Sequence, residues 1–373
     1  MFKKSFVVLM SLLLVLSMLF VGCAKEEATP EEPATEAEEA TPEEAFKVGF
    51  VYVGPIGDGG WSYTHNEGRL YLEEQLGVET IYKESVPEGP EVEKVMKDMI
   101  DQGAKVIFAT SFGYMDYVVK VAEEYPEVTF LHCSGYKDAP NMNNYFGRIY
   151  EARYLSGIVA GLKTESDKIG YVAAYEIPEV IRGINAFTLG VQSVNENATV
   201  AVRWTHTWYD PANEKEAAKA LLDEGADVIA QHQDTAGPQQ AAEERGAFSI
   251  GYHTDMSAAA PNAFMTAPIW DWGPYYTEQV DKIMKGEWTN EPYWGGMEDG
   301  VVKLAEFTEN APAEAQAIVD EATAALADGS LVVFAGPLYD QEGTLKVEDG
   351  KVMSDGEMLS MDWFVKGVEG KIE

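Results

Sequence analysis

The stretch from Phe50 to Arg69, FVYVGPIGDGGWSYTHNEGR, passes from an apolar strand pattern into a glycine-rich turn with an unusual set of side chains. The turn carries Asp58 and Trp61, and His65 follows one helical turn later. A carboxylate, an indole and an imidazole can accept hydrogen bonds, stack on an aromatic ring or exchange protons. This turn is therefore the first candidate for a binding site.

Side chains of the same types follow several other apolar runs that we predict to be strands. The aromatic candidates are Trp61, Phe112, Tyr114, Trp208 and Trp270, and the carboxylate candidates are Asp58, Asp234 and Asp255. Ligands of open parallel sheets bind at the carboxyl ends of the strands. A flat heteroaromatic ligand needs apolar faces, worth about 0.5–1.5 kcal/mol per aromatic pair, and acceptors for its N–H groups. The set predicts a site for a planar, nitrogen-rich molecule.

Other roles for these residues stay open at this level. Each aromatic taken alone also fits a packing role, and Asp58 and Asp255 are placed to cap the segments that follow them. All the histidines fall in strand-end or post-strand segments: His65, His132, His206, His232 and His253. A metal site is an alternative, but no histidine pair has the close spacing of common metal motifs, so we predict no metal or cofactor.

Motifs for catalysis are missing from the sequence. It contains no GxSxG elbow, no HExxH helix and no GxGxxG phosphate loop. A pair of carboxylates can act as acid and base in a glycosidase or nucleoside hydrolase, which remains the enzyme alternative. We predict a binding protein rather than an enzyme.

Two weak internal repeats predict how these side chains are positioned. KVGFVYV from Lys47 matches KIGYVAA from Lys168, and IDQGAKVIFA from Ile100 matches LDEGADVIAQ from Leu222. Each repeat has the pattern strand, helix, strand, helix, strand, and its strands are short apolar runs typical of parallel sheets covered on both faces. The predicted fold is α/β, with two doubly wound, Rossmann-like lobes.

The order of the predicted elements gives provisional lobe boundaries. Residues 46–165 form the first lobe, which ends with a helix in NYFGRIYEARYLSGIVAGLKT and is joined again by residues 268–295. Residues 166–267 form the second lobe, together with part of 296–373, where the runs GVVKLAEF and LVVFAGPL flank a helix over 313–327. A chain that crosses repeatedly between similar lobes predicts a multi-strand hinge and a clamp that closes on a ligand.

The first 45 residues read as targeting and tether segments. Residues 1–22 combine a basic start with an apolar run and predict an export signal, with a retained transmembrane anchor as the alternative. LFVGC resembles a bacterial lipobox, which predicts that Cys23 is lipidated and holds the protein at the extracytoplasmic face of the membrane. Residues 24–45 contain nine Glu and one Lys and predict a disordered tether.

Charge and cysteine content limit the partners. The chain has 27 Lys and Arg against 63 Asp and Glu, a net charge of −36, which argues against nucleic acid or anionic lipid as a partner. It has 2 Cys, and if Cys23 is lipidated then Cys133 has no disulfide partner. We predict that Cys133 is a small buried apolar residue.

Four segments carry a resemblance to a known family: VGPIGDGGWSYTHNEG, GADVIAQHQD, GYHTDMS and YYTEQVDKIMKGEW. Over residues 46–373 the chain resembles the basic membrane protein (PnrA-like) family of substrate-binding lipoproteins that serve ABC importers. The resemblance implies a type I periplasmic-binding-protein fold, a purine nucleoside ligand and an ABC permease as partner. It also implies ligand contacts from Asp58, Trp61 and Asp255.

Two departures from the family pattern alter the expected ligand. His253 stands where nucleoside binders of this family have an additional Asp, and the segment from Ile269 to Trp272 lacks the lysine that can hold the ribose. The loss of ribose-directed groups and the gain of indoles suggest a free purine base such as adenine. A nucleoside or a sugar remains the alternative ligand.

Overall fold

The computed structural model describes residues 45–372. The predicted export signal, the lipidation site Cys23 and the acidic tether as far as residue 44 lie outside the described residues.

The first sheet is parallel throughout and has the order β12-β5-β4-β3-β1-β2. Its strands are β1 Lys47–Val51, β2 Glu79–Lys83, β3 Val106–Ala109, β4 Thr129–Cys133, β5 Met142–Gly147 and β12 Tyr293–Gly295. Strand β12 comes from far along the chain and pairs with β5 at the edge.

The second sheet has the order β10-β9-β8-β6-β7-β16, again with parallel pairing. Its first five strands repeat the order β5-β4-β3-β1-β2 of the first sheet, and the sixth strand, β16, lies at the edge opposite to that of β12. Its strands are β6 Lys168–Ala173, β7 Thr199–Trp204, β8 Val228–His232, β9 Phe248–Ile250, β10 Phe264–Thr266 and β16 Val368–Glu369. The predicted repeat is confirmed, because β1 and β6 hold the same place in their sheets, as do β3 and β8.

Helices cover both faces of each sheet. With the first sheet go α1 Trp61–Leu76, α2 Glu91–Asp101, the 3-10 turn η1 Phe112–Tyr114, α3 Met115–Glu124 and α8 Gly273–Lys285. With the second go α4 Ile149–Lys163, α5 Pro178–Val194, α6 Pro211–Asp223, α7 Gly237–Glu244, the 3-10 turn η2 Ser257–Ala259, α9 Ala315–Ala327 and α10 Asp355–Leu359. We call these two bodies the first and second lobes.

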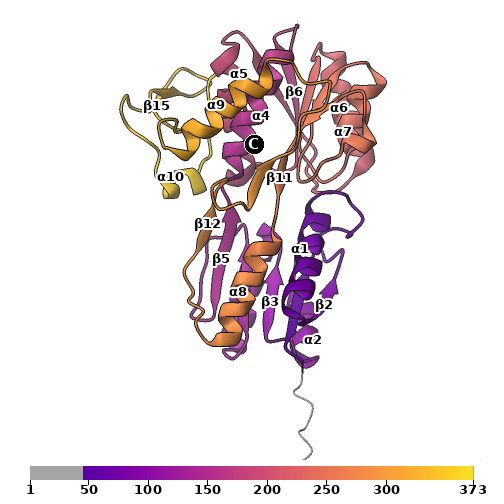
Figure 1. Ribbon diagram of the computed structural model, residues 1–373, viewed down its shortest axis with the longest axis vertical. Helices are drawn as coiled ribbons and strands as arrows, with labels where there is room; N and C mark the ends of the chain where they lie inside the picture. The colour runs from indigo at the N-terminus through magenta and orange to yellow at the C-terminus, as the bar shows by residue number, and fades with distance from the viewer. Residues whose placement is uncertain (1–44, 373) are drawn as a thin grey trace, which may run out of the picture. The chain divides into compact units, whose positions relative to one another are not determined.

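Alternation within single strands explains the layering of the first lobe. In β3, Val106 and Phe108 join the apolar cluster under α1 and α8, whereas Ile107 joins the cluster under α2 and α3. Successive side chains of a strand point to opposite faces, so a run of consecutive apolar residues fits a sheet buried on both sides. Figure 1 shows α8 beside α1, although the two helices are far apart in sequence.

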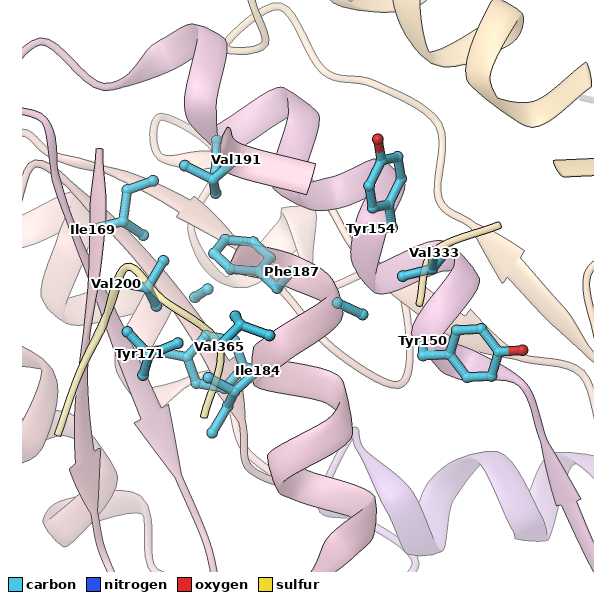
Figure 2. Packing of buried hydrophobic residues seen from close by; sticks show 14 of the residues in the cluster. Tyr150, Tyr154, Ile169, Tyr171, Ile184, Phe187, Val191, Val200, Val333 and Val365 are labelled. Atoms are coloured by element: carbon cyan, nitrogen blue, oxygen red, sulfur yellow. The ribbon is translucent and has the colours of Figure 1, made fainter. Parts of the chain in front are cut away.

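The helix over residues 149–163 belongs to the second lobe, contrary to the sequence-based prediction. Its buried residues, among them Tyr150, Tyr154 and Leu155, pack against α5 and the strands of the second sheet (Figure 2). The apolar face of α4 is buried where it meets Phe187 and its neighbours, so the first lobe ends near Gly147 rather than at residue 165.

The chain crosses between the two sheets three times within residues 45–372: after β5, between β10 and β12, and after β12. The crossing segments include β11 Pro268–Trp270, which pairs antiparallel with β13 Val302–Leu304. Within residues 268–295, α8 packs on α1 and β12 pairs with β5, so this segment adds a helix and a strand to the first lobe. These crossings form the hinge.

The C-terminal part completes the second lobe. Val333, Phe334 and Val365 join its main apolar cluster, and β16 pairs with β7 at the sheet edge. The apolar run from Leu331 to Leu338 was predicted to be a strand but forms turns, and only its last residue enters the short pair β14 Leu338–Tyr339 and β15 Leu345–Val347. Val333 and Phe334 of this run are buried, and its pairing with residues 351–353 is limited to an isolated bridge between Ala335 and Val352.

Local signals agree with the predicted helix ends. Gly103 and Gly225 follow α2 and α6 with φ of 96° and 99°, a conformation that glycine adopts at little cost. Cys133 is buried, as predicted. Within residues 45–372, none of the helices combines the length and apolar character needed to cross a membrane.

Candidate functional site

The topology of both sheets identifies one edge where a ligand site is expected. In the order β2-β1-β3 the connections leave β1 and β3 in opposite directions, and the same is true of β6 and β8 in the second lobe. Ligands of such sheets bind at this switch point, beyond the carboxyl ends of the strands. Trp61 and Ser111 follow β1 and β3, and Glu179 and Asp234 follow β6 and β8.

A small cavity lies where these four strand ends meet. It contains about 320 Å³ of empty space and is bounded by residues from both lobes: Val53, Trp61, Ser111, Phe112, Ser134, Glu179, Trp208, His232, Asp234 and His253. Three aromatic rings, two carboxyl groups and two imidazoles therefore surround one space. The structure brings together four of the predicted site residues here: Trp61, Phe112, Trp208 and Asp234.

Trp61 is the first residue of α1, and its indole is fixed by contacts on the side away from the cavity. Its indole N–H donates to the carbonyl oxygen of Thr110 at 2.6 Å, which ties the start of α1 to the end of β3. Its ring lies edge-on to His65, with centroids 4.2 Å apart. The contacts fix the orientation of the indole while one side of it remains at the cavity.

Phe112 and Trp208 bring rings to the cavity from different lobes. Phe112 opens the 3-10 turn η1 after β3 and is half-buried. Trp208 lies in the loop after β7, and its indole N–H donates across the lobes to Glu88 Oε2 at 3.2 Å. Glu88 also accepts hydrogen bonds from Ser111 Oγ at 2.6 Å and from Gly113 N at 2.8 Å. These contacts within the first lobe fix the position of the carboxylate that accepts from Trp208.

Asp234 is the most buried carboxyl group of the cavity, with 2% of its surface exposed. Oδ1 lies 3.1 Å from His253 Nε2, while Oδ2 has no hydrogen-bond partner among the described residues. Burial raises the pKa of Asp234 well above its usual value, and the nearby carboxylates, Asp58 first among them, raise this pKa further. A ligand N–H or O–H is the missing partner that such a group requires.

His232 and Glu179 form the neighbouring part of the wall. His232 Nε2 lies 3.4 Å from Glu179 Oε1, and burial lowers the pKa of His232 to about 4, so the imidazole is neutral at pH 7. Its Nδ1 has no partner within the described part of the chain. Glu179 also accepts a hydrogen bond from Ser134 Oγ of the first lobe, a second link between the lobes.

Asp58 holds the start of α1 instead of lining the cavity. Its carboxylate accepts from the backbone N–H groups of Gly60, Ser62 and Tyr63 at 2.7, 3.0 and 3.0 Å. Burial raises its pKa to about 6 in spite of these three donors. The capping interpretation of this residue matches the geometry, because the N–H groups of Ser62 and Tyr63 in the first turn donate to it.

Tyr114, Asp255 and Trp270 also lie away from the cavity wall. Tyr114 is fully buried and donates its hydroxyl to the carbonyl of Val86, so it packs under α3. Asp255 accepts from Ser257 N at 2.8 Å and lines a separate surface groove beside α1. Trp270 lies behind the cavity, stacked on Trp272 with ring centroids 4.7 Å apart. The cavity does not reach these three side chains.

The remaining histidines serve the structure of the first lobe or lie at the surface. His65 and His132 are fully buried, and His132 Nε2 lies 2.7 Å from the carbonyl oxygen of Ser111. His206 has a side chain that is 58% exposed. Across residues 45–372 no three His, Cys, Asp or Glu side chains are close enough together to hold a metal ion.

Glu179 is the main cavity residue that the sequence analysis missed. The two repeats start at Lys47 and Lys168, and the same shift of 121 residues carries Asp58 onto Glu179. Applying the repeat to the turn after the first strand of the second lobe would have found it. Ser134 and Val53 carry no signal of this kind.

Two similar lobes, a hinge of three crossings and an enclosed site between them define a class: a substrate-binding protein with the type I periplasmic fold. A solute-binding protein of an ABC transporter system from Aeropyrum pernix K1 is similar in structure, with a TM-score of 0.67 over 77% of this chain and 92% of that one at 20% identity. Another from Conexibacter woesei has a TM-score of 0.63 over 77% of this chain and 98% of that one at 24% identity. These likenesses confirm the fold.

Sequence relatives make the assignment narrower. The family described as ABC transporter substrate-binding protein PnrA-like matches residues 45–330. A purine-binding protein of Brucella abortus is 43% identical over 332 residues, 88% of this chain and 95% of its own length. A putative ABC transporter glucose-binding protein of Haloferax volcanii is 39% identical over 353 residues, 94% of this chain and 87% of its own. The chain belongs to the PnrA-like family of ABC transporter substrate-binding proteins, a family of binding proteins and not of enzymes.

Proposed function

We propose that this protein captures a purine outside the cytoplasm, with a free base such as adenine preferred over a nucleoside, and delivers it to an ABC permease. The observation that supports this most is the composition of the cavity. Three rings from two lobes surround Asp234, whose Oδ2 is buried and has no partner among the described residues. The printed name of the Brucella relative, a purine-binding protein, agrees with this chemistry.

The polarity of the cavity favours a base. The lining residues include no lysine or arginine. A ribose brings several hydroxyl groups that require partners when buried, whereas a base needs stacking faces and a few acceptors.

Closure of the lobes completes the site. Trp208 with Glu88, Ser134 with Glu179, and Thr254 with the carbonyl of Gly59 all bond across the lobes. Ligand bound to one lobe of an open form gains the rings of the other lobe on closing, and the population shifts by the difference in affinity for the two forms. In this proposal the closed form is the one that the permease recognises.

Calorimetry tests the ligand directly. The chain from Ala24 onward keeps every described helix and strand, and is titrated with adenine, hypoxanthine, adenosine, guanosine and glucose. We expect adenine or another free base to bind most tightly. Much tighter binding of a nucleoside would contradict the preference for a base, and binding of glucose alone would contradict the purine proposal and favour the ligand named for the Haloferax relative. Chromatography of the nucleoside titrations tests for hydrolysis.

Removal of the Phe112 ring is expected to weaken purine binding. Phe112→Ala loses one stacking face, and base–aromatic stacking is worth about 1–3 kcal/mol per base, so the affinity falls about 5- to 150-fold. The melting temperature changes little because the ring is only half-buried. Tyr136→Ala is the matched control, since this nearby ring is 65% exposed and does not line the cavity. Equal affinities for the two variants would show that Phe112 does not stack on the ligand.

Replacement of Cys23 tests the membrane anchor, which lies outside the described residues. In the producing cells, Cys23→Ala is expected to abolish incorporation of labelled fatty acid and to move the protein from the membrane fraction to the medium or periplasm. A thioether-linked lipid on the cysteine is the anchor that the sequence predicts. Retention of the variant in the membrane would favour an uncleaved transmembrane segment.

A further inference from the structure

The chain of contacts behind Asp234 determines where its hydrogen atoms are. The indole N–H of Trp270 points at His253 Nδ1, 3.2 Å away, and His253 Nε2 lies 3.1 Å from Asp234 Oδ1. An indole nitrogen is a donor only. His253 Nδ1 must therefore accept, which leaves the hydrogen of a neutral imidazole on Nε2, where it donates to Asp234.

The surroundings of His253 support a neutral ring in a fixed position. His253 is 2% exposed, and burial lowers its pKa well below the usual value. Its backbone has a φ of 71°, a left-handed conformation that costs a non-glycine residue about 1–3 kcal/mol and that is found most often at functional sites. Asn, Asp and His adopt this conformation more readily than other non-glycine residues.

We propose that Trp270 and His253 are positioning residues that leave Asp234 with one free oxygen, Oδ2, directed to a planar ligand that offers an N–H or amino group. This inference rests on the proposed function and adds the feature of the ligand that the site selects. His253 bonds to Oδ1, so Oδ2 is the oxygen that has no partner among the described residues. A ligand that has neither a ring N–H nor an amino group loses this contact.

In this proposal the indole N–H of Trp270 fixes the tautomer of His253, a role separate from the packing of its ring. Trp270 also packs against Trp61 and Phe146, with ring centroids 5.8 and 5.2 Å away. Trp270→Phe keeps an aromatic ring in this packing and removes the N–H. His253 is then free to take either tautomer, and in one of them Nε2 no longer donates to Asp234.

Substitution of His253 by Gln or Asn separates its contact with Asp234 through Nε2 from its contact with Trp270 through Nδ1. In His253→Gln the amide nitrogen extends about as far as Nε2 and can donate to Asp234 without help from Trp270. In His253→Asn the amide ends near the position of Nδ1 and does not reach Asp234. We therefore expect His253→Gln to retain adenine affinity within about 3-fold and His253→Asn to lose about 10-fold, the range of one hydrogen bond.

The decisive experiment combines NMR of the His253 tautomer with adenine binding by Trp270→Phe, measured in both the wild-type and the His253→Gln protein. Nitrogen NMR of isotope-labelled histidine in the chain from Ala24 onward, without ligand, is expected to show His253 with a bare Nδ1 and a protonated Nε2, and a mixture of tautomers in Trp270→Phe. The His253 signals are assigned by their loss in His253→Gln. Trp270→Phe is expected to weaken adenine binding about 3- to 10-fold in the wild-type background and to have no effect in the His253→Gln background.

Two results would overturn the proposal. One is that His253 of the wild type carries its hydrogen on Nδ1. The other is that Trp270→Phe lowers adenine affinity equally in the wild-type and His253→Gln proteins, which would show that Trp270 is a packing residue only. The NMR result does not depend on any ligand. If no purine binds the wild-type protein, the proposed function fails, and the tautomer still decides whether Trp270 and His253 act on Asp234 as stated.

Discussion

Gly60→Ala is expected to weaken adenine binding by at least about 100-fold while the two lobes stay folded, a loss of about 2.7 kcal/mol. A Cβ atom at this position would lie 2.0 Å from the backbone carbonyl oxygen of Asp234 and 2.8 Å from its carbonyl carbon. Gly60 belongs to the first lobe and Asp234 to the second, so the clash is between lobes. Backbone atoms on both sides cannot rotate away as a side chain does, and the lobes must separate.

The consequence for the site is large because closure brings its two halves together. With the lobes held apart, Trp208 and Glu179 of the second lobe move away from Trp61 and Phe112 of the first. The ligand then keeps the contacts of one lobe only, and the free energy gained on closing is lost. Calorimetry with adenine measures the affinity, and small-angle X-ray scattering with and without adenine measures closure.

Gly57→Ala is the matched control for this prediction. Gly57 lies in the same turn, is exposed, and a Cβ there would have no neighbour within 4 Å. Its affinity and its scattering change on adding adenine are expected to equal those of the wild type. Wild-type affinity in Gly60→Ala would show that close approach of the lobes at this point is not needed for binding.

The fold could be predicted from the sequence to the extent that local patterns determine it. Two repeats of short apolar strands and helices predict two parallel sheets, and five strands have the same order in both sheets. The repeats say nothing about which lobe receives the helix at the crossing. Helix α4 has apolar residues around most of its surface, and only packing against α5 determines its place.

The sequence could predict the sheet edge at which the candidate site lies, but not which side chains line the cavity. Collecting residues after each strand found Trp61, Phe112, Trp208 and Asp234, because strand ends of a parallel sheet meet at one edge. The direction of a side chain beyond a strand end depends on one or two backbone angles that sequence does not reveal. Tyr114 turns into the core and Asp58 turns back on its own helix for this reason.

Trp270 shows how a residue can be misplaced and still matter to the site. It was predicted to stack on the ligand, but the structure places its indole behind His253. Sequence reasoning had treated the aromatic residues as one group of stacking faces. The distinction between a ring that touches the ligand and one that orients a neighbour depends on a single N–H direction.

Asp234→Asn is expected to weaken adenine binding about 10- to 100-fold and to make the unliganded protein more stable at pH 7. The amide oxygen can still accept from His253 Nε2, which places the amide NH₂ where Oδ2 was. A ligand N–H then faces a donor instead of an acceptor. A buried donor that loses its acceptor costs about 1–3 kcal/mol, which gives the expected loss.

The pH dependence of stability separates this electrostatic effect from simple packing. Burial raises the pKa of Asp234 in the folded protein, and Asp58, Glu214, Glu179 and Glu88 add to the effect. The folded state therefore binds this proton more tightly than the unfolded state, whose Asp pKa is about 3.9. As pH rises above about 4, ionisation is harder in the folded state and stability falls until the folded pKa is passed.

Denaturant unfolding of the wild type and Asp234→Asn at pH 7 and near pH 3 measures this difference. The variant lacks the group that titrates, so its advantage in unfolding free energy is expected at pH 7 and is expected to become small near pH 3, about one unit below the unfolded pKa, where Asp234 is mostly protonated in both states. Asp255→Asn is the matched control, because that carboxylate lies outside the cavity and is exposed. If Asp234→Asn is less stable than the wild type at pH 7, the carboxylate of Asp234 stabilises the unliganded fold, which would contradict the proposal that Oδ2 lacks a partner until a ligand binds.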